Sequence, residues 1–247
     1  MIYFFLLALF CYTFMQFIET VSFGSRLAGK LTDRLSLGTT LQHSIFIASR
    51  IFLPPLLMAL SFMIESKLSI QLFLLISFSL SFMAFFASLI VFFKFNFFQI
   101  LFQHLFKQYE HNNIPVAIIK VLFGSKEKCN VKNLKKIPRV KDLSLKKCIV
   151  STFAYFFLST GFLISFSFAI IVPDYRMTIS QLTSAFHGIG AIVLALYIDP
   201  MMSKSLDIKI ENSLWLDNIY SIFVGRLLAY LLGSIIFFTL YLYIYFS

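Results

Sequence analysis

Long runs of apolar residues fill most of the chain, and short polar stretches and one long basic stretch separate them. A helix needs about 20 residues to cross the hydrocarbon core of a bilayer, and six of the runs reach that length. The predicted fold class is therefore an all-α integral membrane protein with six transmembrane helices. The predicted spans are residues 2–22, 37–64, 68–93, 148–172, 179–198 and 219–245.

The composition agrees with this pattern. Of the 247 residues, 59% are hydrophobic and only 13% are charged, and the mean hydropathy is +0.86. A soluble domain carries about twice that share of charged residues. No Gly/Ser-rich or Pro-rich linker marks a second unit, so residues 1–247 are expected to form a single polytopic membrane domain.

The distribution of lysine and arginine predicts the orientation of the spans, because cytoplasmic loops of membrane proteins are enriched in both. Residues 107–147 hold eleven of the chain's 21 basic residues and only three acidic ones. Placing the large basic loop 94–147, between the third and fourth spans, in the cytoplasm leaves only Lys67 and Arg176 in the outer loops. Both termini are then predicted to lie outside.

The large basic loop contains an apolar segment, IPVAIIKVLFGS, at residues 114–125, which is too short to span a bilayer. Two interpretations remain open. The loop is either a solvated cytoplasmic segment that follows the charge rule, or it carries a short interfacial helix that its lysines draw to anionic lipid headgroups. Membrane lipids are therefore a candidate partner. Topology alone accounts for the basic residues, so nucleic acid is not an expected partner.

Four charged side chains interrupt the apolar spans or their edges. Glu19 and Arg26 lie near the cytoplasmic end of the first span, seven residues apart and so on one face of a continuing helix. Arg50 lies near the middle of the second span, and Arg226 lies about two turns into the sixth. A charge at the bilayer centre costs at least about 2.5 kcal/mol, so each side chain should face the bundle interior and have a partner.

These charges admit a structural and a functional interpretation. In the structural one, Glu19 pairs with Arg50 and pins the first two spans together. One carboxylate does not balance three arginines, however, and the surplus indicates a cationic groove that opens to the cytoplasm. Because guanidinium groups suit phosphate oxygens, such a groove would take an anionic lipid headgroup. Arg26 would meet it at the interface, and Arg50 and Arg226 would hold it deeper.

Two histidines complete the candidate substrate-binding site. His43 shares one helical face with Arg50 in the second span. His187 shares a face of the fifth span with Ser184 and is expected to be a packing residue rather than a proton relay. The candidate residues are Glu19, Arg26, Arg50, Arg226, His43 and His187.

Two further features stand close to this set. Pro54–Pro55 follow Arg50 by one turn and should open the helix there, because proline lacks a backbone N–H. Asp199, at the end of the fifth span, has no evident charged partner in the sequence.

The chain shows no catalytic or metal-binding pattern. It lacks H-E-x-x-H, G-x-S-x-G and Walker-type motifs, and its spans lack the clustered acids that would hold a metal. Its three cysteines, Cys11, Cys129 and Cys148, show no metal or disulfide spacing. We therefore predict that the protein is not an enzyme and binds no metal or cofactor. Any transport would draw on a gradient, on membrane potential or on consumption of the transported molecule.

Four segments carry a resemblance to a known family. They are FIETVSFGSRLAGK at 17–30, IASRIFLPPLL at 47–57, HGIGAIVLALYIDPMM at 187–202 and GRLLAYLLG at 225–233. In this order, over most of the membrane region, they resemble the Amj family of bacterial lipid II flippases, described as alternates to MurJ. The resemblance points to Glu19, Thr20, Ser22, Arg26, Gly29, Ser49, Arg50, Pro55, Gly188, Gly190, Asp199 and Pro200.

The resemblance implies a transport function. A member of this family would move lipid II, the undecaprenyl-pyrophosphate-linked peptidoglycan precursor, from the inner to the outer leaflet of the bacterial cytoplasmic (inner) membrane for cell-wall synthesis. The residues alone leave three alternatives open. They are a flippase for another polyprenyl-linked or anionic lipid, a non-transport membrane scaffold that binds envelope proteins through its basic loop, and an intramembrane enzyme. Six spans are few for a transporter, so a homodimer is also expected.

Overall fold

A computed structural model describes residues 1–123, 143–207 and 212–246, and these residues fold into helices without a strand. The helices are α1 (Ile2–Val21), α2 (Phe23–Leu31), α3 (Leu35–Ser49), α4 (Leu53–Glu65), α5 (Ile70–Phe93), α6 (Phe95–Tyr109), α7 (Ile114–Phe123), α8 (Leu145–Ile171), α9 (Arg176–Ser180), α10 (Leu182–Val193), α11 (Asp199–Asp207) and α12 (Asn212–Phe246). Two 3-10 turns, η1 (Arg50–Phe52) and η3 (Pro173–Tyr175), and a π-helical turn, η4 (Leu194–Ile198), connect some of them.

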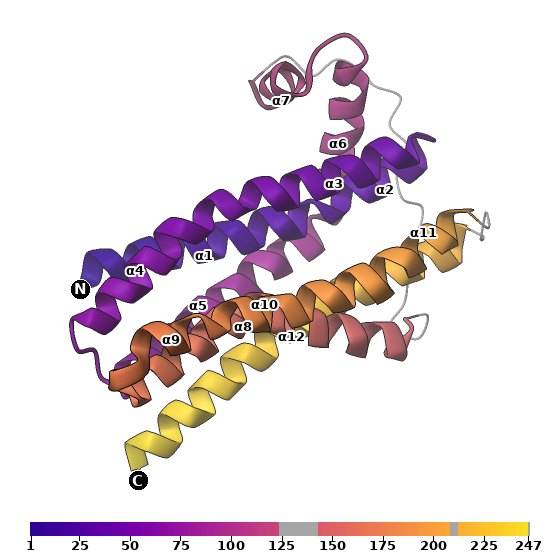
Figure 1. The fold of residues 1–247 in the computed structure, drawn as a ribbon. Coiled ribbons are helices and arrows are strands. Elements are labelled where there is room, and N and C mark those ends of the chain that lie inside the picture. The colour runs from indigo at the N-terminus through magenta and orange to yellow at the C-terminus, as the bar shows by residue number, and fades with distance from the viewer. Residues whose placement is uncertain (124–142, 208–211, 247) are drawn as a thin grey trace.

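Six helical segments among the described residues are long and apolar enough to cross a membrane, as the sequence predicted. They lie side by side in a bundle, with both termini at one end and with α2 and α11 reaching the other end (Figure 1). The segments are Ile2–Leu31, Leu35–Glu65, Ile70–Phe93, Leu145–Ile171, Pro173–Lys204 and Trp215–Phe246.

The first and fifth segments are longer than predicted, because short polar helices continue them. Only Ser22 separates α1 from α2, and η4 leads directly into α11. Arg26, on α2, is buried by neighbouring helices and does not face lipid. A prediction from hydropathy ends a span at a charged residue such as Arg26. It cannot show that neighbouring helices separate this side chain from the lipid.

The second segment is interrupted where the sequence predicted an opening. The α-helical hydrogen bonding of α3 gives way to the 3-10 turn η1, and α4 begins again at Leu53 with Pro54–Pro55 in its first turn. Proline is tolerated at this position because the first N–H groups of a helix have no intrahelical partner. The break therefore places Arg50 at the end of α3, as the first residue of the 3-10 turn that connects α3 to α4.

Small residues set the distances between the helices. The most buried span is α8, which packs against α12, α10 and α5. On the other side of the bundle, α2 and α3 approach so closely that a Cβ atom on Gly38 would stand 2.7 Å from the Ser25 carbonyl oxygen. The fifth span is by contrast the least buried, and its α10 packs mainly on α8. This leaves one flank of α10 free of helix contacts.

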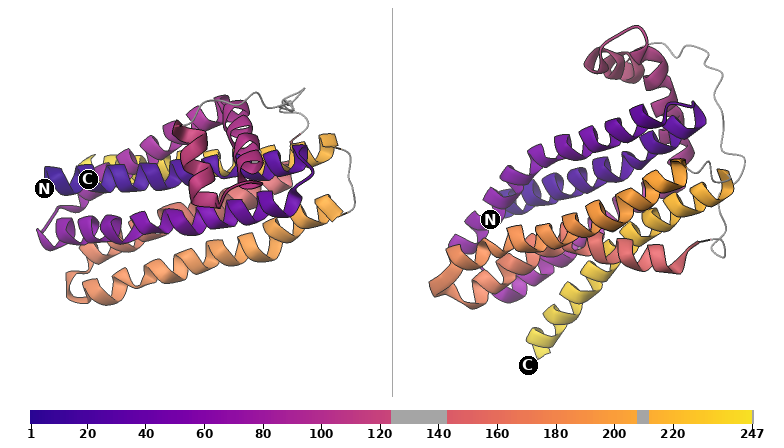
Figure 2. Two further views of the ribbon diagram at one scale, coloured as in Figure 1. Left: turned by 90° about the horizontal axis from the view of Figure 1, so that it is seen from above. Right: turned by 45° about the vertical axis from the view of Figure 1, so that its right-hand side comes forward.

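The described residues 94–123 of the predicted loop 94–147 contain two helices, one of which the sequence analysis missed. α6 buries Phe95, Gln99, Phe102 and Phe106 at helical spacing, and it projects sideways from the bundle with α7 beyond it (Figures 1 and 2). α7 covers residues 114–123 of the apolar segment, so this part of it is helical, and its attraction to lipid headgroups stays a prediction. Residues 124–142, which hold Cys129 and seven of the twelve basic residues of the predicted loop, lie outside the described residues.

Candidate functional site

A cavity of about 590 Å³ lies within the bundle, between α3 and α4 on one side and α10 on the other, with α8 and α12 behind. We call it the polar cavity, because side chains from several spans bring charged and hydrogen-bonding groups to its wall. These side chains are Ser22, Gln42, His43, Arg50, Tyr155, Thr183, Ser184, His187, Asp199 and Arg226.

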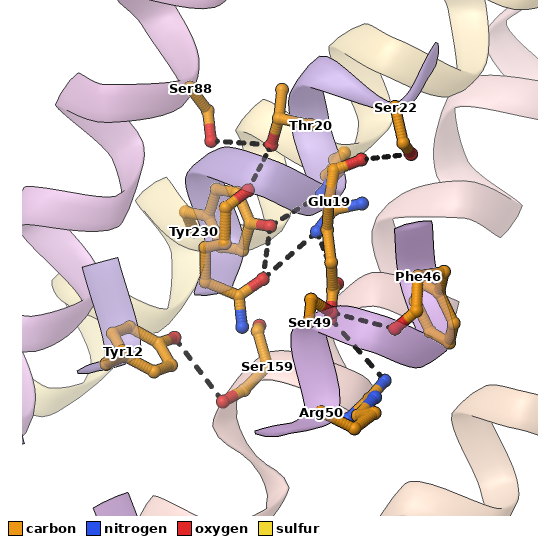
Figure 3. Close-up of polar contacts among 12 residues, drawn as sticks. Tyr12, Glu19, Thr20, Ser22, Phe46, Ser49, Arg50, Ser88, Ser159 and Tyr230 are labelled. Carbon is orange, nitrogen blue, oxygen red and sulfur yellow. Dashed lines mark hydrogen bonds and ion pairs between the residues drawn. The ribbon is translucent and has the colours of Figure 1, made fainter. Parts of the chain in front are cut away.

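Glu19 links the helices behind this wall, and it is only 4% exposed. One carboxylate oxygen, Oε2, accepts a hydrogen bond from Arg226 Nη2 at 2.7 Å. The other, Oε1, accepts one from Ser49 Oγ at 3.0 Å and lies 3.7 Å from Arg50 Nη2 (Figure 3). The predicted Glu19–Arg50 pair is present, but the shorter contact of Glu19 is to Arg226.

Arg226 is almost completely enclosed by its partners, with 1% of its surface exposed. Besides Glu19, its guanidinium donates to Gln16 Oε1 at 3.1 Å and to the Tyr230 hydroxyl at 2.6 Å, and that hydroxyl in turn donates to Gln16 at 2.6 Å. The guanidinium also lies 4.8 Å from the centre of the Tyr155 ring. A buried charge is tolerated when it is paired and hydrogen-bonded, and Arg226 is paired with Glu19 and bonded through its Nε and Nη2 atoms.

Arg50 is held differently. Its side chain is 26% exposed, and its separation of 3.7 Å from Glu19 is beyond hydrogen-bond distance. The guanidinium rests 4.5 Å from the centre of the Phe46 ring and lines the polar cavity. Of the three arginines, Arg50 is therefore the one that can turn its forked donors toward a ligand.

Arg26 and Asp199 form an ion pair that the sequence analysis did not expect. Arg26 Nη2 lies 3.0 Å from Asp199 Oδ1. The sequence showed Arg26 on the helix face of Glu19 and no evident charged partner for Asp199, but α11 continues the fifth span and brings Asp199 to Arg26 on α2. Glu19 and Asp199 together face three arginines, so the predicted surplus falls to one positive charge.

Both candidate histidines line the polar cavity. His187 lies on α10 with its ring stacked on Phe162, at 6.3 Å between ring centres, which fits the predicted packing role. Its Nε2 atom is nevertheless buried without a hydrogen-bond partner in the described part of the chain, as are Gln42 Oε1 and Thr183 Oγ1. His43 lies on α3 and faces the cavity with Gln42. The cavity thus combines one surplus cation with several unsatisfied polar groups.

The structure brings five of the six predicted residues together at the cavity or directly behind it, and Arg26 joins them through Asp199. Sequence reasoning missed Gln16 and Ser49 as partners of the charged groups. Gln16 precedes Glu19 by three residues and so lies on its helix face, which was a usable signal. Ser49 carried no such signal, because its bond to Glu19 joins separate spans.

The geometry supports binding more readily than catalysis. Guanidinium groups bind phosphate oxygens through paired donors, and Arg50 presents such a fork beside uncharged hydrogen-bonding groups that would suit a sugar or amide. Within the described ranges, no group of three His, Cys, Asp or Glu side chains could hold a metal ion. The arrangement therefore matches a site for an anionic, polar headgroup.

Comparison with known protein families places the chain beside one of them. A protein-family model described as "Amj: Alternate to MurJ" matches residues 11–246, which include nearly all of the six membrane-spanning segments and every residue of the polar cavity. No curated protein and no solved structure matches the chain.

Proposed function

The chain belongs to the Amj family of alternates to MurJ, and from this membership and the polar cavity we propose that it moves lipid II from the inner to the outer leaflet of the bacterial cytoplasmic membrane. Lipid II has a pyrophosphate, a polar disaccharide-pentapeptide and a long polyprenyl chain. It is made on the cytoplasmic face and used on the other, so a protein that moves it needs a polar site inside the membrane region.

The observation that carries the proposal is the state of Arg50. It lines the cavity, is partly exposed and lies beyond hydrogen-bond distance of its carboxylate neighbour. A pyrophosphate could take its forked donors without first breaking a tight ion pair. Arg226 then has a supporting role, because its hydrogen bond to Glu19 Oε2 holds the carboxylate in place. Only the other oxygen, Oε1, is near Arg50.

The orientation of the bundle gives the proposal a direction. The termini lie together at one end, and Arg26, Lys30 and Arg34 lie on or after α2 at the other (Figure 1). By the enrichment of basic residues in cytoplasmic loops, we place the α2 end in the cytoplasm and both termini outside. The ion pair of Arg26 with Asp199 then lies at the cytoplasmic side of the cavity, where a headgroup would enter.

The helices around the cavity suggest how a lipid would enter. α3 and α4 form one wall and α10 the other, and α10 packs mainly on α8. A headgroup could pass between these walls while its hydrocarbon chain stays in apolar surroundings. We propose no chemical step for the protein. The direction of transfer would be set by a gradient, by membrane potential or by use of lipid II on the outer face.

Complementation in a bacterium depleted of its own lipid II flippase tests this function. Wild-type protein should sustain wall growth, whereas Arg50→Gln should not, and Arg50→Lys should do so poorly because it keeps the charge without the fork. Lys146→Gln is the matched control, since it removes one positive charge from the exposed start of α8, outside the cavity. Full rescue by Arg50→Gln at normal membrane levels would refute the cationic site, and failure of the wild-type protein at normal levels would favour another lipid or a scaffold role.

A further inference from the structure

A second hollow, of about 490 Å³, lies between α1 and α3 and is overhung by α6 and α7. We call it the apolar groove. Its wall includes Ile18, Ile45, Ala48, Leu101, Leu105 and Val121, and Ser49 is the one lining residue with a polar side chain.

The groove offers nothing to a polar ligand. The single proton of the Ser49 hydroxyl is already taken, because two acceptors lie within hydrogen-bond distance, the Glu19 carboxylate at 3.0 Å and the Phe46 carbonyl oxygen at 2.8 Å. A polar group placed in the groove would lose its hydrogen bonds to water without replacement. Since α1 and α3 belong to membrane-spanning segments, a hydrocarbon chain is the occupant that this wall suits.

The groove and the polar cavity lie on opposite sides of one contact, the one between α1 and α3. Ser49 lines the groove and the next residue, Arg50, lines the cavity; Val21, the last residue of α1, lines the groove and the next residue, Ser22, lines the cavity. The two hollows therefore adjoin each other along α3, and the hydrogen bond from Ser49 to Glu19 is part of the partition between them.

We propose that the apolar groove binds the hydrocarbon chain of the same lipid whose anionic headgroup occupies the polar cavity. This inference rests on the proposed function and adds a chain site to it. One molecule with a charged head and a long apolar chain matches the pair of hollows on either side of α3. A bilayer phospholipid such as phosphatidylglycerol also has an anionic phosphate and apolar chains, so the test must include it as a competitor.

The proposal separates chain recognition from headgroup recognition, so two probes test it on the purified full-length protein in detergent micelles. Undecaprenyl pyrophosphate carries both head and chain, and inorganic pyrophosphate carries the head alone. Ala48→Trp and Val121→Trp fill the groove from α3 and from α7. Ile149→Trp is the control, because Ile149 is 59% exposed on α8 and lines neither hollow.

The groove-filling variants should bind undecaprenyl pyrophosphate at least about tenfold more weakly than wild type and inorganic pyrophosphate equally well. Arg50→Gln should weaken binding of both probes. Unchanged binding of undecaprenyl pyrophosphate by both groove variants, or an equal loss in Ile149→Trp, would overturn the chain site. So would displacement of this probe by phosphatidylglycerol as readily as by unlabelled undecaprenyl pyrophosphate. If Arg50→Gln changes neither probe while the groove variants do, the headgroup assignment fails and the chain site stands.

Discussion

At the scale of single residues, the site is organised around one carboxylate that two arginines share. Glu19 bonds Arg226 at 2.7 Å and leaves Arg50 at 3.7 Å. The two arginines therefore have different tasks. Arg226 is enclosed and holds the network together, whereas Arg50 keeps donors available to the polar cavity.

This division predicts the effect of removing the carboxylate. Glu19→Gln should destabilise the protein by about 3–5 kcal/mol, because it leaves the enclosed Arg226 without a counter-charge. Adding Arg226→Met should recover most of this loss, whereas adding Arg50→Gln should recover little. Thermal unfolding of the purified variants measures both effects. Equal recovery by the two second substitutions would show that Glu19 serves both arginines alike.

The sequence revealed the charged residues of this site but not how they pair. Glu19, Arg50 and Arg226 stand out because charges are rare in apolar spans. The contact between Glu19 and Arg226 joins residues 207 positions apart, and that between Arg26 and Asp199 joins residues 173 apart. Helical periodicity relates residues only within one helix. It could therefore predict the helix face of Glu19, but not which arginine on another helix pairs with it.

At the scale of helices, glycines decide how α10 meets the rest of the bundle. A Cβ atom on Gly190 would stand 2.6 Å from Leu158 Cγ and 2.7 Å from the Ala154 carbonyl oxygen, both on α8. A Cβ atom on Gly188, two residues earlier, would meet nothing within 4 Å. Close approach at Gly190 is thus one of the contacts that dock this sparsely packed span.

A matched pair of substitutions on α10 tests this docking. Gly190→Ala should destabilise the protein by about 1–3 kcal/mol, since overpacking pushes α10 off α8. Gly188→Ala should be neutral or slightly stabilising, because alanine is the better helix former. The melting temperatures of the two variants, measured in the same detergent, give the comparison. Equal stability of the Gly190→Ala and Gly188→Ala proteins would contradict this, because it would mean that α8 moves to admit the methyl group without loss of stability.

Helix prediction succeeded where apolar length was the signal and failed where tertiary contacts decided. Six spans were predictable because each apolar run is long enough to cross a bilayer. α6 was not, since its buried face includes Gln99 and Gln103 and its charged neighbours resemble a loop. Pro54–Pro55 predicted the break after α3, but the extension of the fifth span into α11 depends on a partner on α2 that no local pattern shows.

At the scale of the whole molecule, the account requires that the α2 end of the bundle faces the cytoplasm. Single cysteines, introduced after Cys11, Cys129 and Cys148 are each replaced by serine, test this with an impermeant thiol reagent. Met177→Cys, 82% exposed near the η3 turn, should react in intact cells. His111→Cys, exposed between α6 and α7, should react only after permeabilisation. The reverse pattern would invert the bundle and place the Arg26–Asp199 pair on the wrong face for capturing lipid II.

Transfer of lipid II by the purified protein tests the central claim most directly. Proteoliposomes holding labelled lipid II would be followed for its appearance in the opposite leaflet. We expect wild type and Lys146→Gln to transfer it at similar rates, and Arg50→Gln to be about tenfold to a hundredfold slower, as the loss of charge-assisted hydrogen bonds implies. Transfer by Arg50→Gln at the wild-type rate, or transfer of phosphatidylglycerol as fast as lipid II, would contradict a cationic cavity that moves lipid II.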